Sequence, residues 1–142
     1  MKKVVFLFML ALISFGTSAQ SITDGTWFNE EKDGRIQFYI QADKLYGKIA
    51  WLQKPEENGK SRLDVNNPKA SDAKKPLLGL VFLKGFVKDG TKAWEDGTIY
   101  DPKSGKTYSS TIDAANPDRL DVRGFVGFSF LGRTTVFTRA TK

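Results

Sequence analysis

The residue types that most often do chemistry in proteins are partly missing from this chain. It has no histidine and no cysteine, which removes the usual general base, the soft-metal ligands and the thiolate nucleophile. The charged residues of greatest interest are Asp101 and Arg123, because each falls in an aromatic, strand-like segment where a charge must be paired or solvated. Asp101 could serve an enzyme together with a lysine or tyrosine, or it could accept backbone donors in its own Asp-Pro turn. We favour the turn, because aspartate is a preferred turn residue for this reason.

Two other motifs point only weakly to chemistry. The run SGKT at 104–107 is similar to the end of a phosphate-binding P-loop, but Tyr100 stands where that motif needs a glycine, and a strand-like pattern follows instead of a helix. Asp89, Asp96 and Asp101 lie near turns, yet their spacing matches no EF-hand calcium loop. We therefore predict no metal site and no cofactor.

Residues 1–19 have the layout of a secretory signal peptide. Lys2 and Lys3 precede an apolar run over 4–13, and small residues end at Ala19. A membrane anchor is the alternative, but a spanning helix needs roughly 20 apolar residues, and this run is much shorter. We predict cleavage after Ala19, export to the periplasm or the medium, and no integral membrane segment after cleavage. The short leader that begins with lysines is typical of bacteria.

Composition limits the remaining classes of function. The chain carries 22 basic and 16 acidic residues, and removal of the leader leaves 20 basic residues, a net charge of +4. These charges are interspersed, which favours a solvated surface and gives no expectation of nucleic-acid binding. Without cysteine, neither a lipid-modified N-terminal cysteine nor a disulfide can form. Residues 20–142 are long enough to bury one hydrophobic core and are predicted to form a single domain.

The elements that position Asp101 and Arg123 are predicted to be strands. Glycine, aromatic and β-branched residues are plentiful, turn signals recur about every ten residues, and helical spacing is almost absent. Segment 97–108 is a β-hairpin signal, in which Asp101, Pro102 and Gly105 reverse the chain. Eight strands are predicted, over 25–31, 35–41, 44–53, 77–88, 92–101, 106–114, 119–126 and 132–140.

Consecutive strands with mostly short connections favour an antiparallel, up-and-down barrel. Closing the first strand on the last removes the exposed edges of the sheet, and eight strands enclose an interior that is either filled or able to hold one small ligand. Loop 54–76 is longer than the ~12 to 15 residues beyond which loops are usually functional or disordered. It is interpreted as a lid or as a mobile surface loop. Asn67 and Pro68 could begin a short helical turn that runs to Lys74 and stops at Pro76.

Alternation along the strands predicts which side chains face inward. In segment 44–53 one face carries Leu45, Gly47, Ile49 and Trp51. Segment 77–88 is apolar on both faces, so each face needs a cover. The predicted interior face is Val81, Leu83 and Val87 with Gly79 and Gly85, and the predicted outer face is Leu80, Phe82 and Phe86 with Lys84. Three interpretations of the outer face are open: the long loop covers it, a partner binds to it, or the two faces are reversed and Lys84 points into a cavity. We favour cover by the loop.

The two ends of the barrel domain carry a further pair. Trp27 begins the first strand and Arg139 lies in the last, where closure of the barrel would let the guanidinium stack on the indole and close one end. A Gly-x-Trp start with a late arginine resembles lipocalins and their avidin-like relatives, small barrels that carry apolar ligands. The opening GTWFN at 25–29 is similar to that of avidin-type biotin binders. Because Trp51 and Trp94 are the only other tryptophans, biotin binding is not implied.

A longer ordered set of motifs resembles the bacterial exported family DUF2147. It covers nearly the whole mature chain and comprises GTW at 25–27, LYGKI at 45–49, PLLG at 76–79, GTIYDP at 97–102 with Gly105 and Tyr108, LDVRGF at 120–125 and LGRT at 131–134. Phe137 stands where a tryptophan is expected in that family. The resemblance implies a calycin-like or lipocalin-like barrel and supplies no activity.

The favoured function is binding of a small apolar or amphipathic molecule inside the barrel, beneath loop 54–76. Such sites have aromatic walls with a few polar groups, so the candidate contacts are Tyr46, Trp51, Tyr100, Asp101, Tyr108 and Arg123. Asp101 is expected either to hold its turn or to face Arg123 across neighbouring strands. The first alternative is an envelope protein-protein interaction module with a filled barrel and a partner surface at Leu80, Phe82 and Phe86. The second is an enzyme that uses Asp101 with a lysine or tyrosine, and it is the less expected.

Overall fold

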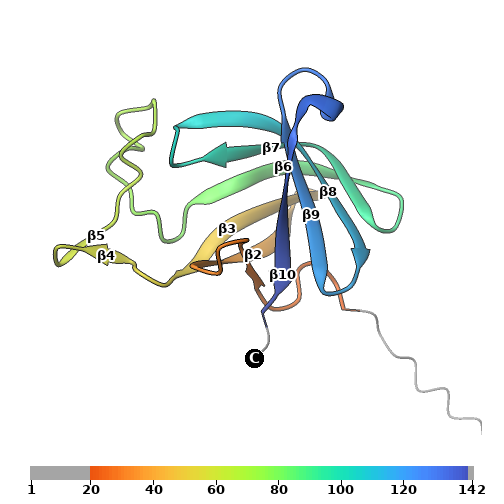
Figure 1. The fold of residues 1–142 in the computed structure, drawn as a ribbon, viewed down its shortest axis with the longest axis horizontal. Coiled ribbons are helices and arrows are strands. Elements are labelled where there is room, and N and C mark those ends of the chain that lie inside the picture. The colour runs from red at the N-terminus through yellow and green to blue at the C-terminus, as the bar shows by residue number, and fades with distance from the viewer. Residues whose placement is uncertain (1–19, 141–142) are drawn as a thin grey trace, which may run out of the picture.

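Eight antiparallel strands close into a barrel in the computed structural model, which describes residues 20–140. The order around the barrel is β1-β10-β9-β8-β7-β6-β3-β2 (Figure 1), and this confirms the predicted fold class. The predicted leader, 1–19, lies outside the described residues. The barrel strands are β1 (Trp27–Phe28), β2 (Gly34–Gln41), β3 (Lys44–Leu52), β6 (Val81–Asp89), β7 (Ala93–Asp101), β8 (Lys106–Asn116), β9 (Arg119–Phe125) and β10 (Arg133–Arg139).

The up-and-down order sends alternate connections to opposite ends of the barrel. At one end lie the β2–β3, β6–β7 and β8–β9 turns together with residues 20–26. The β2–β3 turn has positive φ at both Ala42 and Asp43 (49° and 62°), the backbone that a two-residue hairpin requires. At the other end lie the β1–β2 turn, the long β3–β6 connection, the β7–β8 turn and the β9–β10 loop, which contains the 3₁₀ turn η1 (Ser129–Leu131). We call this second end the mouth.

The hydrophobic core fills the end opposite the mouth and extends to the middle of the barrel, where some of its side chains also line the cavity described below. Its largest fully buried apolar side chains are Trp27, Phe38, Phe86, Leu45, Leu83, Ile112, Leu120 and Val122. Trp27 donates its indole hydrogen to the carbonyl of Ile22 (2.9 Å), and the guanidinium of Arg139 lies 4.2 Å from the centre of the indole ring. Arg139 also donates to the carbonyls of Asp24 (2.7 Å) and Pro117 (2.9 Å). These contacts tie the segment before β1 across this end of the barrel.

The long connection, residues 53–80, forms a structured arm. It contains a short hairpin of β4 (Glu56–Glu57) and β5 (Lys60–Ser61), and further along Leu63 pairs with Pro76. Figure 1 shows the arm, in yellow and green, extending away from the barrel. The expected helical turn over 68–74 is reduced to hydrogen-bonded turns, in which Asn67 caps the amide of Lys69 (2.9 Å) and Ala73 donates to the Lys69 carbonyl (3.0 Å). No helix of the described residues is long and apolar enough to span a bilayer.

The predicted facing of Trp51 is wrong because of a β-bulge. Ile36 pairs with Ile49, but the next pair is Arg35 with Trp51, so Ala50 is an extra residue in β3. The bulge moves Trp51 away from the interior face of Ile49. Trp51 instead packs edge-on against Phe28, with ring centres 6.5 Å apart, and the Arg35 guanidinium lies 4.9 Å from its ring.

The predicted faces of β6 are right for Leu83, which is fully buried, but wrong beyond Lys84, because β6 and β7 carry bulges at the same level. Gly85 and Asp96 both have left-handed backbone (φ 72° and 58°). The β6–β7 register is the same on both sides of this level, whereas the pairings with β3 and β8 shift by one residue. Phe86 therefore turns inward against Gly97 and is fully buried, while Val87 is 40% exposed instead of interior.

A second irregularity lies near the start of β6. The pairing with β3 moves from Leu83 with Gly47 to Val81 with Lys48, and Phe82 is the residue left between. Phe82 lines the cavity and packs against the core, so neither Phe82 nor Phe86 lies on the proposed outer face. Lys84 is exposed, which disproves the alternative that it points into a cavity.

Candidate functional site

The mouth of the barrel opens into a cavity of about 1400 Å³. Its inner wall is apolar and is made by side chains from six strands: Ile36, Ile49, Phe82, Ile99, Val122 and Phe137. Tyr108 and Thr135 add hydroxyl groups to this wall. The cavity extends from the barrel to the arm, where Leu63 and Val65 also line it. Its volume therefore exceeds the roughly 300 to 1,000 Å³ of ordinary ligand pockets.

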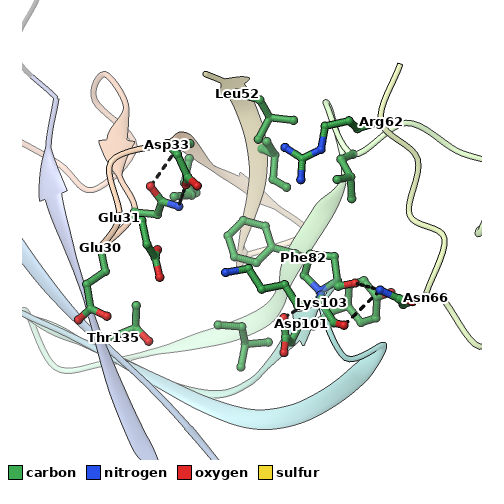
Figure 2. A pocket seen from close by; sticks show the side chains of 18 of the residues that line it. Glu30, Glu31, Asp33, Leu52, Arg62, Asn66, Phe82, Asp101, Lys103 and Thr135 are labelled. Carbon is green, nitrogen blue, oxygen red and sulfur yellow. Dashed lines mark hydrogen bonds between the residues drawn. The ribbon is translucent and has the colours of Figure 1, made fainter. Parts of the chain in front are cut away.

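Charged residues surround the entrance to this apolar space. Figure 2 shows Glu30, Glu31 and Asp33 of the β1–β2 turn on one side, with Arg62 of the arm and Lys103 of the β7–β8 turn on the other. Arg133, at the start of β10, lies 3.7 Å from Glu30. The entrance thus presents carboxylates and cations from connections far apart in the sequence.

The arm is fastened to the rim by a buried carboxylate. Asp64 is 1% exposed and accepts hydrogen bonds from the phenol of Tyr100 (2.7 Å) and the side-chain amide of Asn67 (2.9 Å). Desolvation of the phenol, together with its bond to Asp64, raises the pKa of Tyr100 to about 12. A proton is therefore retained on this hydroxyl at neutral pH, as the hydrogen bond to a carboxylate requires.

A second contact joins the arm to the β7–β8 turn. The side chain of Asn66 donates to the carbonyls of Pro102 and Lys103, both at 3.1 Å. Gly105 has φ of 72°, and a Cβ at this position would collide with the backbone carbonyl of Asn66. Glycine is thus required here both by the turn and by the close approach of the arm.

The two charges singled out in the sequence have separate partners. Asp101 accepts from the amide of Lys103 (3.0 Å) and the hydroxyl of Ser104 (2.8 Å), so its carboxylate holds the turn. Arg123 donates to the carbonyl of Ser129 in η1 and to the hydroxyl of Thr134 (3.0 Å for the latter). Of the two expected arrangements for Asp101, the structure has the turn.

Comparison with known proteins agrees with this architecture. The sequence profile of a family described as uncharacterized proteins conserved in bacteria, DUF2147, matches residues 25–139. The chain belongs to the DUF2147 family. The predicted family is therefore confirmed, while no curated protein matches the sequence.

One solved structure has a similar fold. The fold is similar to that of protein HP1028 from Helicobacter pylori, described as belonging to the lipocalin family, with a TM-score of 0.71. The two proteins are 22% identical, and the match covers 83% of this chain and 82% of the other. At this level of identity the likeness establishes a lipocalin-like fold.

Three of the six candidate contact residues lie together in the cavity at the mouth. Tyr100, Asp101 and Tyr108 are part of its lining. Tyr46 stacks on Tyr39, with ring centres 5.6 Å apart, on the outward-facing side of β2 and β3. The other two, Trp51 and Arg123, pack against Phe28 and η1 respectively.

Several residues of this site were not predicted from the sequence. Phe82 and Thr135 line the wall, Arg62 and Lys103 lie at the entrance, and Asp64 holds the arm. Strand order alone would have shown which connections share an end of the barrel, since every second connection of an up-and-down barrel meets there, but not which end is open. Within residues 20–140, no group of three or more acidic side chains is placed to hold a metal ion, and this includes Asp89, Asp96 and Asp101.

Proposed function

We propose that this DUF2147 protein binds a small amphipathic molecule, with the apolar part inside the barrel and the polar group at the charged entrance. The main support for this proposal is that one continuous cavity has both an apolar inner wall and a charged rim. Burial of about 300 Å² of apolar ligand surface would contribute roughly 7 kcal/mol before the costs of association. The fold of the chain is one in which such an interior can hold a single small ligand.

The depth of the cavity limits the apolar part of the ligand. Trp27, Phe38 and Phe86 fill the far end of the barrel and are almost completely buried. The ligand would therefore occupy the half nearest the mouth, against Ile99, Val122 and the ring of Phe82. A compact or short apolar group fits this space better than a long extended chain.

The entrance is suited to a polar group of either charge. Carboxylates of the β1–β2 turn oppose the cations Arg62 and Lys103 across the cavity (Figure 2). A cationic group could pair with the first set and an anionic group with the second. We further propose that binding takes place outside the cytoplasm, on the strength of the leader at 1–19.

A tryptophan placed on the cavity wall tests the proposal. Thr135→Trp should fill part of the cavity beside the wall formed by β9 and β10. It should weaken binding of the fluorescent probe N-phenyl-1-naphthylamine at least about tenfold, because about 1.4 kcal/mol of contact is enough for that loss. Thr98→Trp, on an exposed position of β7, is the matched control and should bind the probe as the parent does. Equal probe binding by both variants would contradict the assignment of the cavity.

The natural ligand can be sought directly. Native mass spectrometry of the parent and of Thr135→Trp, each purified from the compartment to which it is exported, should show a bound small molecule on the parent alone. Repeated absence of a bound mass, combined with no response to the probe, would overturn the proposed function.

A further inference from the structure

The β9–β10 loop, residues 126–132, is an exposed apolar tip. It contains no charged residue, and four of its side chains are largely in water: Val126 (71%), Phe128 (66%), Phe130 (74%) and Leu131 (67%). The rings of Phe128 and Phe130 stack with their centres 5.5 Å apart. Single exposed apolar residues are ordinary on protein surfaces, but a contiguous group of this kind usually marks a site of interaction.

The base of the loop is held firmly on the barrel. Arg123 donates to the Ser129 carbonyl, and Gly132 packs so closely on the backbone of Gly124 that a Cβ would collide with it. Figure 1 shows the loop, in dark blue, standing clear of the barrel strands. The two phenyl rings are thus presented outward by a fixed support.

The tip adjoins the cavity. Val126 and Leu131, at the two sides of the loop, are also part of the cavity lining. A surface that touched the tip would therefore lie directly beside the entrance through which a ligand must pass.

We propose that this loop inserts Phe128 and Phe130 into the surface of a lipid bilayer, and that the barrel exchanges its ligand with the membrane. The exchange rests on the proposed function, whereas the insertion does not. A molecule with a substantial apolar part partitions into bilayers, so an entrance held at the bilayer surface avoids passage of the ligand through water.

The shape of the loop and the charges beside it favour a bilayer over a protein partner. A specific protein interface usually buries about 800 Å² on each partner, which a protruding loop of seven residues does not offer by itself. Interfacial insertion needs only a few apolar side chains with cations at the level of the headgroups. Arg123 and Arg133 flank the loop on β9 and β10. The side chain of Arg133 is 83% exposed even though it lies 3.7 Å from Glu30. Each such cation near an anionic surface contributes attraction.

Vesicle flotation tests the insertion. The chain used begins at Gln20, because the core of the barrel lies within the described residues. The vesicles contain equal parts of palmitoyl-oleoyl phosphatidylglycerol and phosphatidylcholine. Phe128→Ser/Phe130→Ser should reduce the fraction of protein that floats at least about tenfold, since each phenyl ring contributes through the apolar area that it buries. The matched control, Ile40→Ser/Val87→Ser, alters two exposed apolar residues near the opposite end and should float like the parent.

The lack of cysteine allows a direct probe of depth. A nitrobenzoxadiazole label on Phe130→Cys should gain fluorescence and shift to the blue when vesicles are added, and the same label on Thr91→Cys, in the β6–β7 turn, should not. Equal flotation of the parent and the loop variant, or a label at 130 that stays in water, would overturn the insertion. Capture of a protein through the loop by a parent that binds no vesicles would overturn it too.

The probe-binding assay separates this inference from the proposed function. Without vesicles, Phe128→Ser/Phe130→Ser should bind N-phenyl-1-naphthylamine as the parent does, because neither ring is part of the cavity lining. If the parent inserts into vesicles but binds no probe, the proposed function fails and the insertion stands. If the parent binds probe but never floats with vesicles, the insertion fails alone.

Discussion

Asp64 and Tyr100 form the tightest polar contact between the arm and the barrel. A carboxylate that is 1% exposed would be strongly destabilising without donors, and Tyr100 and Asn67 supply them at 2.7 and 2.9 Å. The pair joins residues 36 positions apart in the sequence. Together with the contacts of Asn66, this hydrogen bond fixes the arm beside the cavity.

Removal of the Tyr100 hydroxyl should loosen the arm and lower the stability of the protein. Tyr100→Phe leaves one oxygen of Asp64 without its donor while the carboxylate stays buried, which costs about 1 to 3 kcal/mol. Urea unfolding measures the loss. Tyr46→Phe, which removes a hydroxyl from the outward-facing stack with Tyr39, is the control and should change stability by less than about 0.5 kcal/mol. Equal stability of the two variants would show that the Asp64 contact contributes nothing.

The same variant should alter the response of the protein to alkali. The pKa of Tyr100 is raised to about 12 from the ordinary value of 10.0, so the folded state holds the phenol neutral where the unfolded chain begins to ionise. This contribution to stability is complete below the ordinary pKa of 10.0 and is lost as the pH rises toward the raised pKa of about 12. The stability difference between the parent and Tyr100→Phe should therefore shrink across that window, measured by urea unfolding at stepped pH. A difference that stays constant would contradict the assignment.

At the scale of elements, the β7–β8 hairpin is where the barrel and the arm meet. Its turn is held from within by Asp101 and is contacted from outside by Asn66. The hairpin was the clearest signal in the sequence, because Asp-Pro and glycine at fixed offsets are local turn chemistry. Its role as a support for the arm could not be predicted, because nothing in either segment identifies the other.

Substitutions at two glycines of similar backbone conformation distinguish the need for glycine in a turn from the need for glycine where the arm makes contact. Gly105 and Gly90 have φ of 72° and 69°, but an added Cβ would collide with Asn66 only at Gly105 and would meet open space at Gly90. Both alanine variants should lose about 1 to 2 kcal/mol from left-handed backbone. Gly105→Ala should lose about 1 to 3 kcal/mol more, because the arm must move. Limited proteolysis should also cut the arm faster in Gly105→Ala, and identical behaviour of the two variants would contradict the docking.

Bulges account for the strand faces that sequence alternation predicted wrongly. Alternation assigned Phe86 to the outside and Val87 to the inside, and the paired bulges at Gly85 and Asp96 reverse both. Gly85 was visible in the sequence, but glycine in a strand indicates only that a bulge is possible there. Whether a bulge forms there depends on the pairing with β3 and β8, and that pairing is not a local property of the sequence.

At the scale of the whole molecule, the barrel has one filled end and one open end. Arg139 links the last strand to the segment before the first, and its side chain is only 11% exposed. Trp27 and Arg139 are directly opposed in the β1–β10 pairing, so the stack reinforces closure of the barrel. The open end, by contrast, is built from connections whose side chains leave the cavity accessible.

Loss of Arg139 should weaken the closure of the entire barrel. Arg139→Ala removes the stack on Trp27 and the bonds to the carbonyls of Asp24 and Pro117, and we expect a loss of at least about 3 kcal/mol in urea unfolding. Arg119→Ala is the control, because Arg119 is more exposed and, among residues 20–140, forms an ion pair only with Asp121 on its own strand. It should lose less than about 1 kcal/mol. Equal losses of unfolding free energy in the two variants would contradict the role of Arg139 in closing the barrel.

The sequence by itself determined the strand class, the number of barrel strands and the family, because alternation, turn residues and short motifs are local properties of the chain. Only the tertiary structure decided which side chains fill the interior, since the bulges at Ala50, Phe82 and Gly85 follow from pairing between strands. It also decided that the cavity stays open at the mouth and that the arm is fastened beside it. Those features depend on contacts such as Asp64 with Tyr100, which form only when distant segments meet.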